Sequence, residues 1–271
     1  MKTLSIPIYY VDAFTDRLFH GNPAAVVLLD EWLPDERLIA IAAEINLPET
    51  AFLVDEHIRW FTPVVEVKLC GHATLAAAFI LNKFKGHPTN PIIFQSLSGE
   101  LTVHKHQDSF TLDFPILESQ RVDLVDYPQL STILNTPISE LWIAKDRYLC
   151  FVDSPEQVQD CQPNMAQLAQ LPLPGLTITA KNHDDQADFV SRYFAPAKGV
   201  NEDPVTGTSH CAIAPIWAKR LQKNALIGHQ ISARGGKIDC LVDQSRVKLT
   251  GKATLLFSRN DSRLINYCIY L

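Results

Sequence analysis

The stretch from Cys70 to Leu81, CGHATLAAAFIL, is the part of the sequence that decides the expected fold. After Thr74 it contains only small and apolar residues, and a helix that is apolar on every side is expected to be buried in a core. A second stretch, Thr206–Leu221 (TGTSHCAIAPIWAKRL), repeats the design. A glycine turn at Gly207 precedes the second apolar helix, which is predicted over Cys211–Leu221.

Short strand signals surround both helices. Runs of β-branched and aromatic residues alternate with turns before and after each of them, and the second half repeats the order of the first. We therefore predict two pseudo-symmetric lobes, residues 1–118 and 119–261, each with many short strands around one buried helix. Residues 117–137 are expected to connect the lobes, and the last strand, about 262–271, to pack back onto the first. The active site is expected in the cleft between the lobes.

The composition fits a globular protein and excludes several kinds of partner. Of the 271 residues 46% are hydrophobic and 20% charged, which allows a sizeable core. Lys plus Arg number 24 against 30 for Asp plus Glu, and the net charge of −6 argues against a nucleic-acid partner. No run approaches the ~18 apolar residues of a membrane span, and Met1–Pro7 lacks the features of a signal peptide. We expect no membrane partner and a cytoplasmic location.

The cysteines and histidines give no sign of a disulfide framework or a metal centre. The six cysteines are scattered without a Cys-x-x-Cys pair, so reduced and mostly buried thiols are expected at Cys70, Cys150, Cys161, Cys211, Cys240 and Cys268. His104 and His106 would share one face of a strand, but no third ligand is near them in the sequence. We interpret them as a polar strand face and predict no metal.

The two glycine turns are candidates for an anion site. Helix N-termini present unpaired backbone N–H groups and a positive dipole end, which bind carboxylates and stabilise enolates. We therefore expect Gly71-His72-Ala73 and Gly207-Thr208-Ser209 to face each other and bind a small carboxylate. Each turn alone is also consistent with ordinary helix capping, and the hypothesis depends on their recurrence in both halves.

Four side chains near these turns could transfer protons. Glu49 lies in a turn between a helix and an apolar strand, where partial desolvation would raise its pKa, although a solvated loop carboxylate fits the position as well. Asp203 could act similarly or could cap a turn before Pro204. His72 and Cys70 begin the first helix, and each is also a common buried structural residue.

Several other enzyme classes lack their required parts. The sequence has no Gly-x-Gly-x-x-Gly motif and no Walker lysine, which excludes the usual nucleotide-binding loops. It has no Gly-x-Ser-x-Gly elbow for a serine hydrolase, and Cys70 and His72 are placed poorly for a cysteine-protease pair. No lysine context argues for a Schiff-base cofactor. We therefore predict that no cofactor is needed.

Seven motifs, in order along the chain, carry a family resemblance: DAFT (12–15), GNPAAV (21–26), NLPETAF (46–52), FTP (61–63), CGHAT (70–74), EDPVTG (202–207) and TGKA (250–253). Each is short, but the ordered set covers essentially the whole chain. Together they resemble the PhzF-like family of phenazine biosynthesis proteins. The resemblance implies an α+β fold of the diaminopimelate epimerase type, two β-rich lobes each wrapped around a central helix. Homodimers are common in the family.

The resemblance also implies a function. The family's isomerase moves a proton on an amino-substituted cyclohexadiene carboxylic acid without a cofactor, and its acid/base glutamate corresponds to Glu49. We expect a cofactor-independent isomerase of small amino- or cyclic carboxylic acids, with Glu49, His72 and Asp203 catalytic. The expected substrate-binding residues are Asn22, Cys70, Gly71, Ala73, Gly207, Thr208 and Ser209.

Two alternatives remain at this point. Diaminopimelate epimerase and proline racemase, more distant relatives, use a cysteine at each helix start, but here the second position is Thr206, whose hydroxyl does not ionise near neutral pH. A racemase or epimerase using Cys70 is therefore the less favoured reading. The second alternative is a non-catalytic protein that kept the cleft and binds a small molecule or a partner. Such a protein would not need a general base at Glu49.

Overall fold

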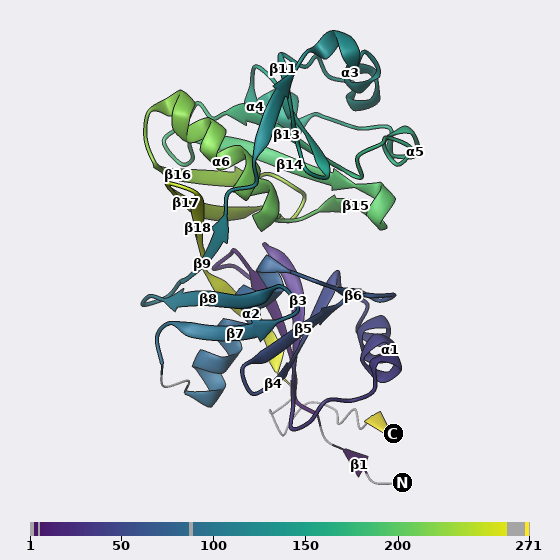
Figure 1. The fold of residues 1–271 in the computed structure, drawn as a ribbon, viewed down its shortest axis with the longest axis vertical. Coiled ribbons are helices and arrows are strands. Elements are labelled where there is room, and N and C mark those ends of the chain that lie inside the picture. The colour runs from purple at the N-terminus through teal and green to yellow at the C-terminus, as the bar shows by residue number, and fades with distance from the viewer. Residues whose placement is uncertain (1–2, 5, 87–88, 259–268, 271) are drawn as a thin grey trace. The chain divides into compact units, whose positions relative to one another are not determined.

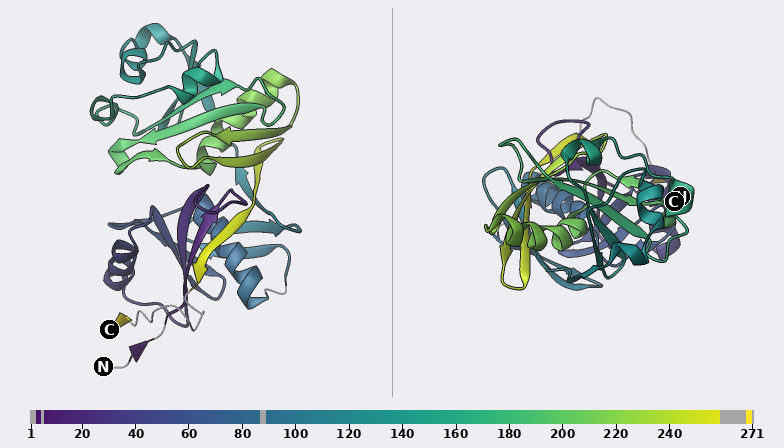
Figure 2. Two further views of the ribbon diagram at one scale, coloured as in Figure 1. Left: turned by 180° about the vertical axis from the view of Figure 1, so that it is seen from behind. Right: turned by 90° about the horizontal axis from the view of Figure 1, so that it is seen from above.

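The computed structural model describes residues 3–4, 6–86, 89–258 and 269–270 (Figure 1). The chain divides into two units, Met1–Leu112 with Gly251–Leu271, and Asp113–Thr250. The return to the first unit begins at Gly251, and of the last strand expected over about 262–271, residues 262–268 and 271 lie outside the described residues. Strand β19 (Ala253–Ser258) pairs antiparallel with β2 (Ile8–Ala13), which places yellow beside purple in Figure 2, left.

The first unit is a mixed sheet around helix α2 (Gly71–Ile80). Its pairing order is β19-β2-β3-β4-β5, with β6 and β7 both paired to β5, and then β7-β8-β9. The pairs β3–β4 and β5–β7 are parallel and the others antiparallel. The bounds are β3 Asn22–Leu29, β4 Glu49–Val54, β5 His57–Phe61, β6 Glu66–Val67, β7 Ile92–Ser96, β8 Gly99–Lys105 and β9 Phe110–Pro115. A separate pair joins β1 (Thr3–Leu4) to β20 (Ile269–Tyr270).

The second unit repeats this pairing scheme strand for strand. Its order is β10-β11-β12-β13-β14, with β15 and β16 both paired to β14, and then β16-β17-β18. Again two pairs are parallel, β12–β13 and β14–β16. The bounds are β10 Ser119–Val122, β11 Glu140–Ala144, β12 Arg147–Phe151, β13 Gly175–Lys181, β14 Phe189–Ala195, β15 Val200–Asp203, β16 Ala225–Gln230, β17 Gly236–Asp243 and β18 Arg246–Gly251. The prediction of two pseudo-symmetric β-rich halves is confirmed.

Each unit encloses one long apolar helix. Helix α2 packs on β2, β3 and β4, and every residue of it except Phe79 is buried, as its uniformly apolar sequence predicts. Helix α6 (Gly207–Leu221) packs on β16 and β17 in the second unit (Figure 1). It begins at Gly207, so the residues predicted as a turn before the helix form its first turn. Pro215 lies in the interior of α6.

The remaining helices cover the outside of the sheets. Helix α1 (Asp35–Ile45) packs Leu38, Ile41 and Ala42 against strand residues of the first unit, as its apolar spacing predicts. It is followed by α2 and the π-helix η1 (Leu81–Lys85). In the second unit α3 (Gln129–Leu134), α4 (Pro155–Gln159) and α5 (Met165–Leu168) contribute to one apolar core, with the 3-10 turns η2 (Leu124–Asp126) and η3 (Pro196–Lys198).

Two local predictions are wrong. Residues 117–137 are not a plain connection, because they contain β10, η2 and α3, whose leucine and isoleucine side chains join the core of the second unit. The sequence also predicts a strand over Gln230–Ala233, whereas the observed strand β16 (Ala225–Gln230) ends where that prediction begins. The side chain of Gln230 turns inward to hydrogen-bond the backbone before α6, and the chain bends after it.

The structure agrees with the prediction of reduced cysteines within the residues it describes. Cys70, Cys150, Cys161, Cys211 and Cys240 are all free and buried, and Cys268 lies outside the described residues. Among the described residues, no helix combines the length and the apolar character needed to cross a bilayer.

Candidate functional site

Three elements of the first unit bring the predicted residues to one place. Strands β3 and β4 are parallel, so their N-terminal ends lie at the same edge, with Ala24 opposite Glu49. Asn22 is the first residue of β3 and Glu49 the first of β4. Helix α2 packs on both strands and supplies Cys70 and His72 from its first turn. The side chains therefore meet although residues on different elements are 21 to 50 positions apart in the sequence.

Gly21 makes the entry to β3 possible. Its φ of +68° lies in the left-handed region, which favours glycine. A Cβ atom at this position would lie 2.2 Å from the carbonyl oxygen of Ala13 on the neighbouring strand. The chain can turn this tightly before Asn22 only because Gly21 has no side chain.

His72 lies at the centre of the group. Its Nε2 is 3.4 Å from Oε2 of Glu49, and its Nδ1 is 3.2 Å from Nδ2 of Asn22. The thiol of Cys70 is 3.5 Å from Nδ1 and 3.9 Å from Nε2 of the same ring. The ring and the thiol are buried, whereas the side chain of Glu49 keeps 23% of its surface exposed. Glu49 is therefore the member of the group that solvent or a ligand can reach.

The imidazole of His72 is held neutral. Burial lowers its pKa to about 4, and a hydrogen bond to the backbone of Pro23 opposes this only in part. At pH 7 the ring therefore acts as a neutral donor and acceptor beside Glu49, and not as an imidazolium ion. The first N–H groups of α2 lie in the same turn, and Cys70, its N-cap, makes no capping side-chain hydrogen bond with them.

The second unit has a corresponding set of groups at the start of α6. The hydroxyl of Thr206, the N-cap residue, donates a 2.5 Å hydrogen bond to Oδ2 of Asp203. Gln230, which is completely buried, accepts from the backbone N–H of Thr206 at 2.8 Å and donates to the carbonyl of Asp203 at 2.7 Å. Asp203 is therefore fixed both by its carboxylate and by its backbone, and it remains partly exposed.

The predicted residues Thr208 and Ser209 have different surroundings. The hydroxyl of Thr208 accepts a hydrogen bond of 3.1 Å from Arg147. Ser209 is completely buried, its hydroxyl is 2.8 Å from that of Thr177, and its backbone N–H donates to the carbonyl of Thr206. The first N–H groups of a helix have no partner within the helix, so those of Gly207 and Thr208 are the donors that α6 can offer to a ligand.

The helix starts of the two units match residue by residue. Cys70 and Thr206 are N-caps with extended backbone, and each is followed by a buried glycine. Four residues beyond each N-cap, a side chain bonds the N-cap carbonyl: the hydroxyl of Thr74 at 2.6 Å and Nδ1 of His210 at 2.9 Å. Thr206 therefore stands where a second thiol would stand, which agrees with the expectation from the sequence.

Two residues that contact the predicted site residues were not identified from the sequence. Arg147 is the first residue of β12, the strand that corresponds to β3, and it contacts Thr208 as Asn22 contacts His72. It is buried and pairs with Asp146 at 2.9 Å. Gln230 ends β16. An alignment of the two halves by strand order would have paired Arg147 with Asn22, whereas no signal in the sequence identified Gln230.

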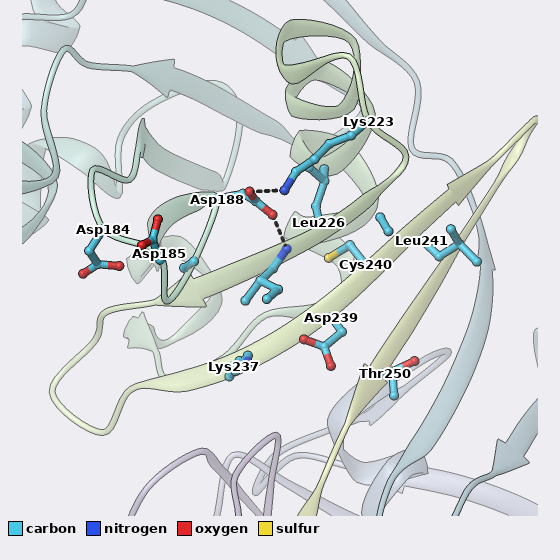
Figure 3. A pocket seen from close by; sticks show the side chains of 13 residues that line it. Asp184, Asp185, Asp188, Lys223, Leu226, Lys237, Asp239, Cys240, Leu241 and Thr250 are labelled. Atoms are coloured by element: carbon cyan, nitrogen blue, oxygen red, sulfur yellow. Dashed lines mark hydrogen bonds and ion pairs between the residues drawn. The ribbon is translucent and has the colours of Figure 1, made fainter.

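A pocket of the second unit lies elsewhere. It has a volume of about 650 Å³ and contains none of the predicted site residues. Its walls mix apolar and charged residues, with Asp184, Asp185 and Lys237 among the charged ones (Figure 3). Asp188 is already paired with Lys223 and accepts a hydrogen bond from the backbone of Ile227. The groups at the helix starts therefore do not lie in this pocket.

Comparison with known proteins settles the family. The family model described as phenazine biosynthesis-like protein (PhzC-PhzF) matches residues 11–259. The chain belongs to this PhzF family. An uncharacterised isomerase of Pseudomonas aeruginosa is 46% identical over 259 residues, which cover 94% of this chain and 98% of the relative. The structure of a PhzF family protein from Enterococcus faecalis has 40% identity and a TM-score of 0.90, covering 94% of this chain and 98% of its own.

The wider fold is shared with enzymes of the diaminopimelate epimerase type. A probable proline racemase from Agrobacterium radiobacter superposes with a TM-score of 0.60 over 94% of this chain and 92% of its own, at 10% identity. The predicted α+β fold class is confirmed. With relatives of about 46% identity named isomerases, this PhzF family chain is an enzyme of the isomerase class that acts on a small molecule.

Proposed function

We propose that this PhzF family chain is a cofactor-independent isomerase that shifts a proton on a small amino- or cyclic carboxylic acid, with Glu49 as the acid/base group. The observation that carries the proposal is the position of Glu49. Its partly exposed carboxylate lies 3.4 Å from the buried, neutral His72 at the first turn of α2. A general base needs both access to the substrate and a fixed orientation, and this pair supplies both.

The proton moves in two steps. Glu49 removes a proton from a carbon next to the acid's conjugated system, the C–H bond breaks, and its electron pair remains on the substrate as an enolate-like anion. Glu49, now protonated, returns the proton to a different carbon of the same anion. No electrons leave the substrate, so the step needs no redox partner. Backbone N–H groups at a helix start stabilise such an anion because they are already oriented toward it.

The remaining predicted residues bind and orient the substrate in this proposal. The N–H groups of Gly71, His72 and Ala73 serve as donors to the carboxylate in the first unit, with Asn22 and Cys70 beside them. In the second unit Asp203 orients a polar substituent, and Gly207 and Thr208 supply further donors. Arg147 contributes a buried positive charge behind Thr208. Ser209 supports the helix start from inside, through Thr177.

The neutral His72 orients Glu49. An imidazolium ion at 3.4 Å would strongly favour the ionised carboxylate and weaken it as a base, whereas a hydrogen bond from a neutral ring has a smaller effect in the same direction. The contact with Asn22 on the opposite ring nitrogen fixes the ring plane. His72 is therefore proposed as a proton relay and orienting group that carries no permanent charge.

A two-stage experiment tests the function. Thermal-shift screening with small amino and cyclic carboxylic acids identifies ligands, and each ligand is then incubated with the enzyme in D₂O. We expect deuterium at carbon with the wild type, exchange slowed by a factor on the order of 10² to 10⁴ with Glu49→Gln, and a much smaller loss of rate with Cys70→Ala. Loss of exchange in Cys70→Ala with retention in Glu49→Gln would favour the thiol racemase. Ligands that bind but never exchange would favour a binding protein.

The quaternary structure and location are further proposals from the resemblance. We propose a homodimer in the cytoplasm, and sedimentation velocity of the purified chain across a concentration series tests the first part. A single species with the mass of one chain at all concentrations would contradict it.

A further inference from the structure

The side chains of Glu49, Cys70 and His72 form a set of metal-ligand atoms. One oxygen of Glu49, the sulfur of Cys70 and a ring nitrogen of His72 all lie within 4.8 Å of one another. Two of the three residues are buried and Glu49 is half-buried, so a cation could enter from the side of the carboxylate. Among the residues that the structure describes, no other group of three His, Cys, Asp or Glu side chains comes together in this way.

The spacing of the three atoms suits tetrahedral zinc. Zn–S and Zn–N or Zn–O bonds of about 2.3 and 2.1 Å at tetrahedral angles separate the ligand atoms from one another by roughly 3.3–3.6 Å. Nε2 of His72 is 3.4 Å from Oε2 of Glu49 and 3.9 Å from Sγ of Cys70. The third separation, between the carboxylate oxygen of Glu49 and the sulfur of Cys70, is within 4.8 Å, so the side chains must rotate toward one another to share one ion.

The surroundings are also those of a metal site. A metal-binding histidine needs partners that fix the orientation of its ring, and the ring of His72 has a hydrogen bond to the backbone of Pro23. A thiolate and a carboxylate together neutralise the charge of a divalent ion, which matters in a place where two of the three ligands are buried.

We propose that Glu49, Cys70 and His72 form a site for a thiophilic divalent cation, Zn²⁺ in the first place, with a fourth position open to water or a ligand. On binding, the Cys70 S–H bond breaks, its proton goes to the solvent, and the sulfur electron pair forms the Zn–S bond. No oxidation or reduction takes place. The proposed site thus differs from the expectation of no metal, which rested on the scattered cysteines and on the lack of a third ligand near His104 and His106.

Occupation of the site has a consequence for catalysis. This consequence rests on the proposed function, because it assumes that Glu49 is the acid/base group. A carboxylate bound to Zn²⁺ cannot also take a proton from carbon, so the metal is an inhibitor here and its removal restores activity. The cell's free zinc would then regulate the enzyme by direct competition for Glu49.

Cobalt spectroscopy tests the site without any turnover. The purified chain, stripped with a chelator, is titrated with Co²⁺, whose thiolate complexes have a charge-transfer band in the near ultraviolet. We expect the band in the wild type and in Cys240→Ala, the control for a buried thiol elsewhere, and its loss in Cys70→Ser, which keeps the side-chain volume. Competition with a chromophoric chelator should show at least about tenfold weaker Zn²⁺ binding in Glu49→Gln and His72→Asn. Circular dichroism confirms that the variants are folded.

The outcomes separate the metal site from the proposed function. Absence of the cobalt band in the wild type, or its persistence in Cys70→Ser, would overturn the site. If the band appears as expected, saturating Zn²⁺ should suppress deuterium exchange and a chelator should restore it. Metal binding with undiminished exchange would show that Glu49 is not the acid/base group, which contradicts the proposed function and leaves the metal site intact.

Discussion

At the scale of single residues, buried histidines determine how the helix starts respond to pH. Burial lowers the pKa of His210 to about 4 from an ordinary 6.5, although the bond to the carbonyl of Thr206 opposes the shift. His210 is completely buried beside Phe189, and a Cβ on Gly228 would lie 2.9 Å from its ring. The start of α6 is therefore built around a neutral imidazole that has no room to be solvated when it is charged.

This makes the stability of the chain dependent on pH below 6.5. Between pH 6.5 and 4 the unfolded chain binds a proton at His210 that the folded chain does not, so the free energy of unfolding falls as the pH falls. The lowering of this pKa from 6.5 to about 4 corresponds to a loss on the order of 3 kcal/mol once pH 4 is reached. Urea unfolding at pH 7 and pH 4.5 should show a smaller loss in His210→Gln than in the wild type. His57→Gln, at an exposed position, is the matched control and should behave as wild type. An equal loss in His210→Gln would refute the assignment.

Gln230 shows what a neutral side chain contributes to the site. It bonds the backbone of Thr206 and of Asp203 and also lies 3.2 Å from the hydroxyl of Thr206. Gln230→Leu would leave the buried N–H of Thr206 without its partner, at a cost of about 1–3 kcal/mol. We expect destabilisation by that amount in urea unfolding and a slower deuterium exchange. Gln120→Leu, at an exposed position of β10, should change neither. Deuterium exchange at the wild-type rate in Gln230→Leu would show that Gln230 does not contribute to the site.

At the scale of elements, the site depends on where strands and helices begin. Asn22, Glu49 and Arg147 are the first residues of β3, β4 and β12, and His72 and Thr208 are the second residues of α2 and α6. Side chains at such positions are held by a regular element on one side and reach beyond its end on the other. A change in the turn that precedes an element should therefore affect the site as well as the fold.

Gly21, in the turn before β3, gives a direct test. Alanine in the left-handed region costs about 1–2 kcal/mol, and at Gly21 its Cβ would in addition lie 2.2 Å from the carbonyl oxygen of Ala13. Gly86 has a similar φ of +58° with open space around it. Gly21→Ala should therefore lower the free energy of unfolding by roughly 3 kcal/mol or more, and Gly86→Ala by only about 1 kcal/mol. Equal effects of the two substitutions would contradict the role of the close contact.

The sequence predicted these elements unevenly, for physical reasons. The buried helices were predictable because their composition leaves no polar face, and β3 and β4 because β-branched residues follow clear turns. The sequence predicts that this helix begins at Cys211, because Gly207, Thr208 and Ser209 have low helix propensity. In the structure α6 begins at Gly207, because the buried contacts of Ser209 and His210 stabilise the first turn. The strand β16 was missed because its alternating pattern, ALIGHQ, includes a glycine and two polar residues.

At the scale of the whole molecule, one scheme is used twice. Both units have the same succession of parallel and antiparallel pairs and one apolar helix inserted at the same place, after β6 and after β15. The residue types at matching positions have diverged, with Asn22 against Arg147, Cys70 against Thr206, and His72 against Thr208. In the sequence the repeat was visible in the order of the expected elements but, at the level of residue identity, only at the two glycine turns, because packing constrains the elements and leaves most residue identities free.

The central claim is that Glu49 carries the proton. The measurement that tests it most directly is deuterium incorporation into a bound carboxylic acid, followed by mass spectrometry, for the wild type, Glu49→Gln and Glu44→Gln. Glu44 is exposed on α1 and provides the control carboxylate. The account predicts that the rate in Glu49→Gln falls by a factor on the order of 10² to 10⁴, with urea unfolding unchanged, while Glu44→Gln exchanges as wild type. Exchange by Glu49→Gln at the wild-type rate would contradict it.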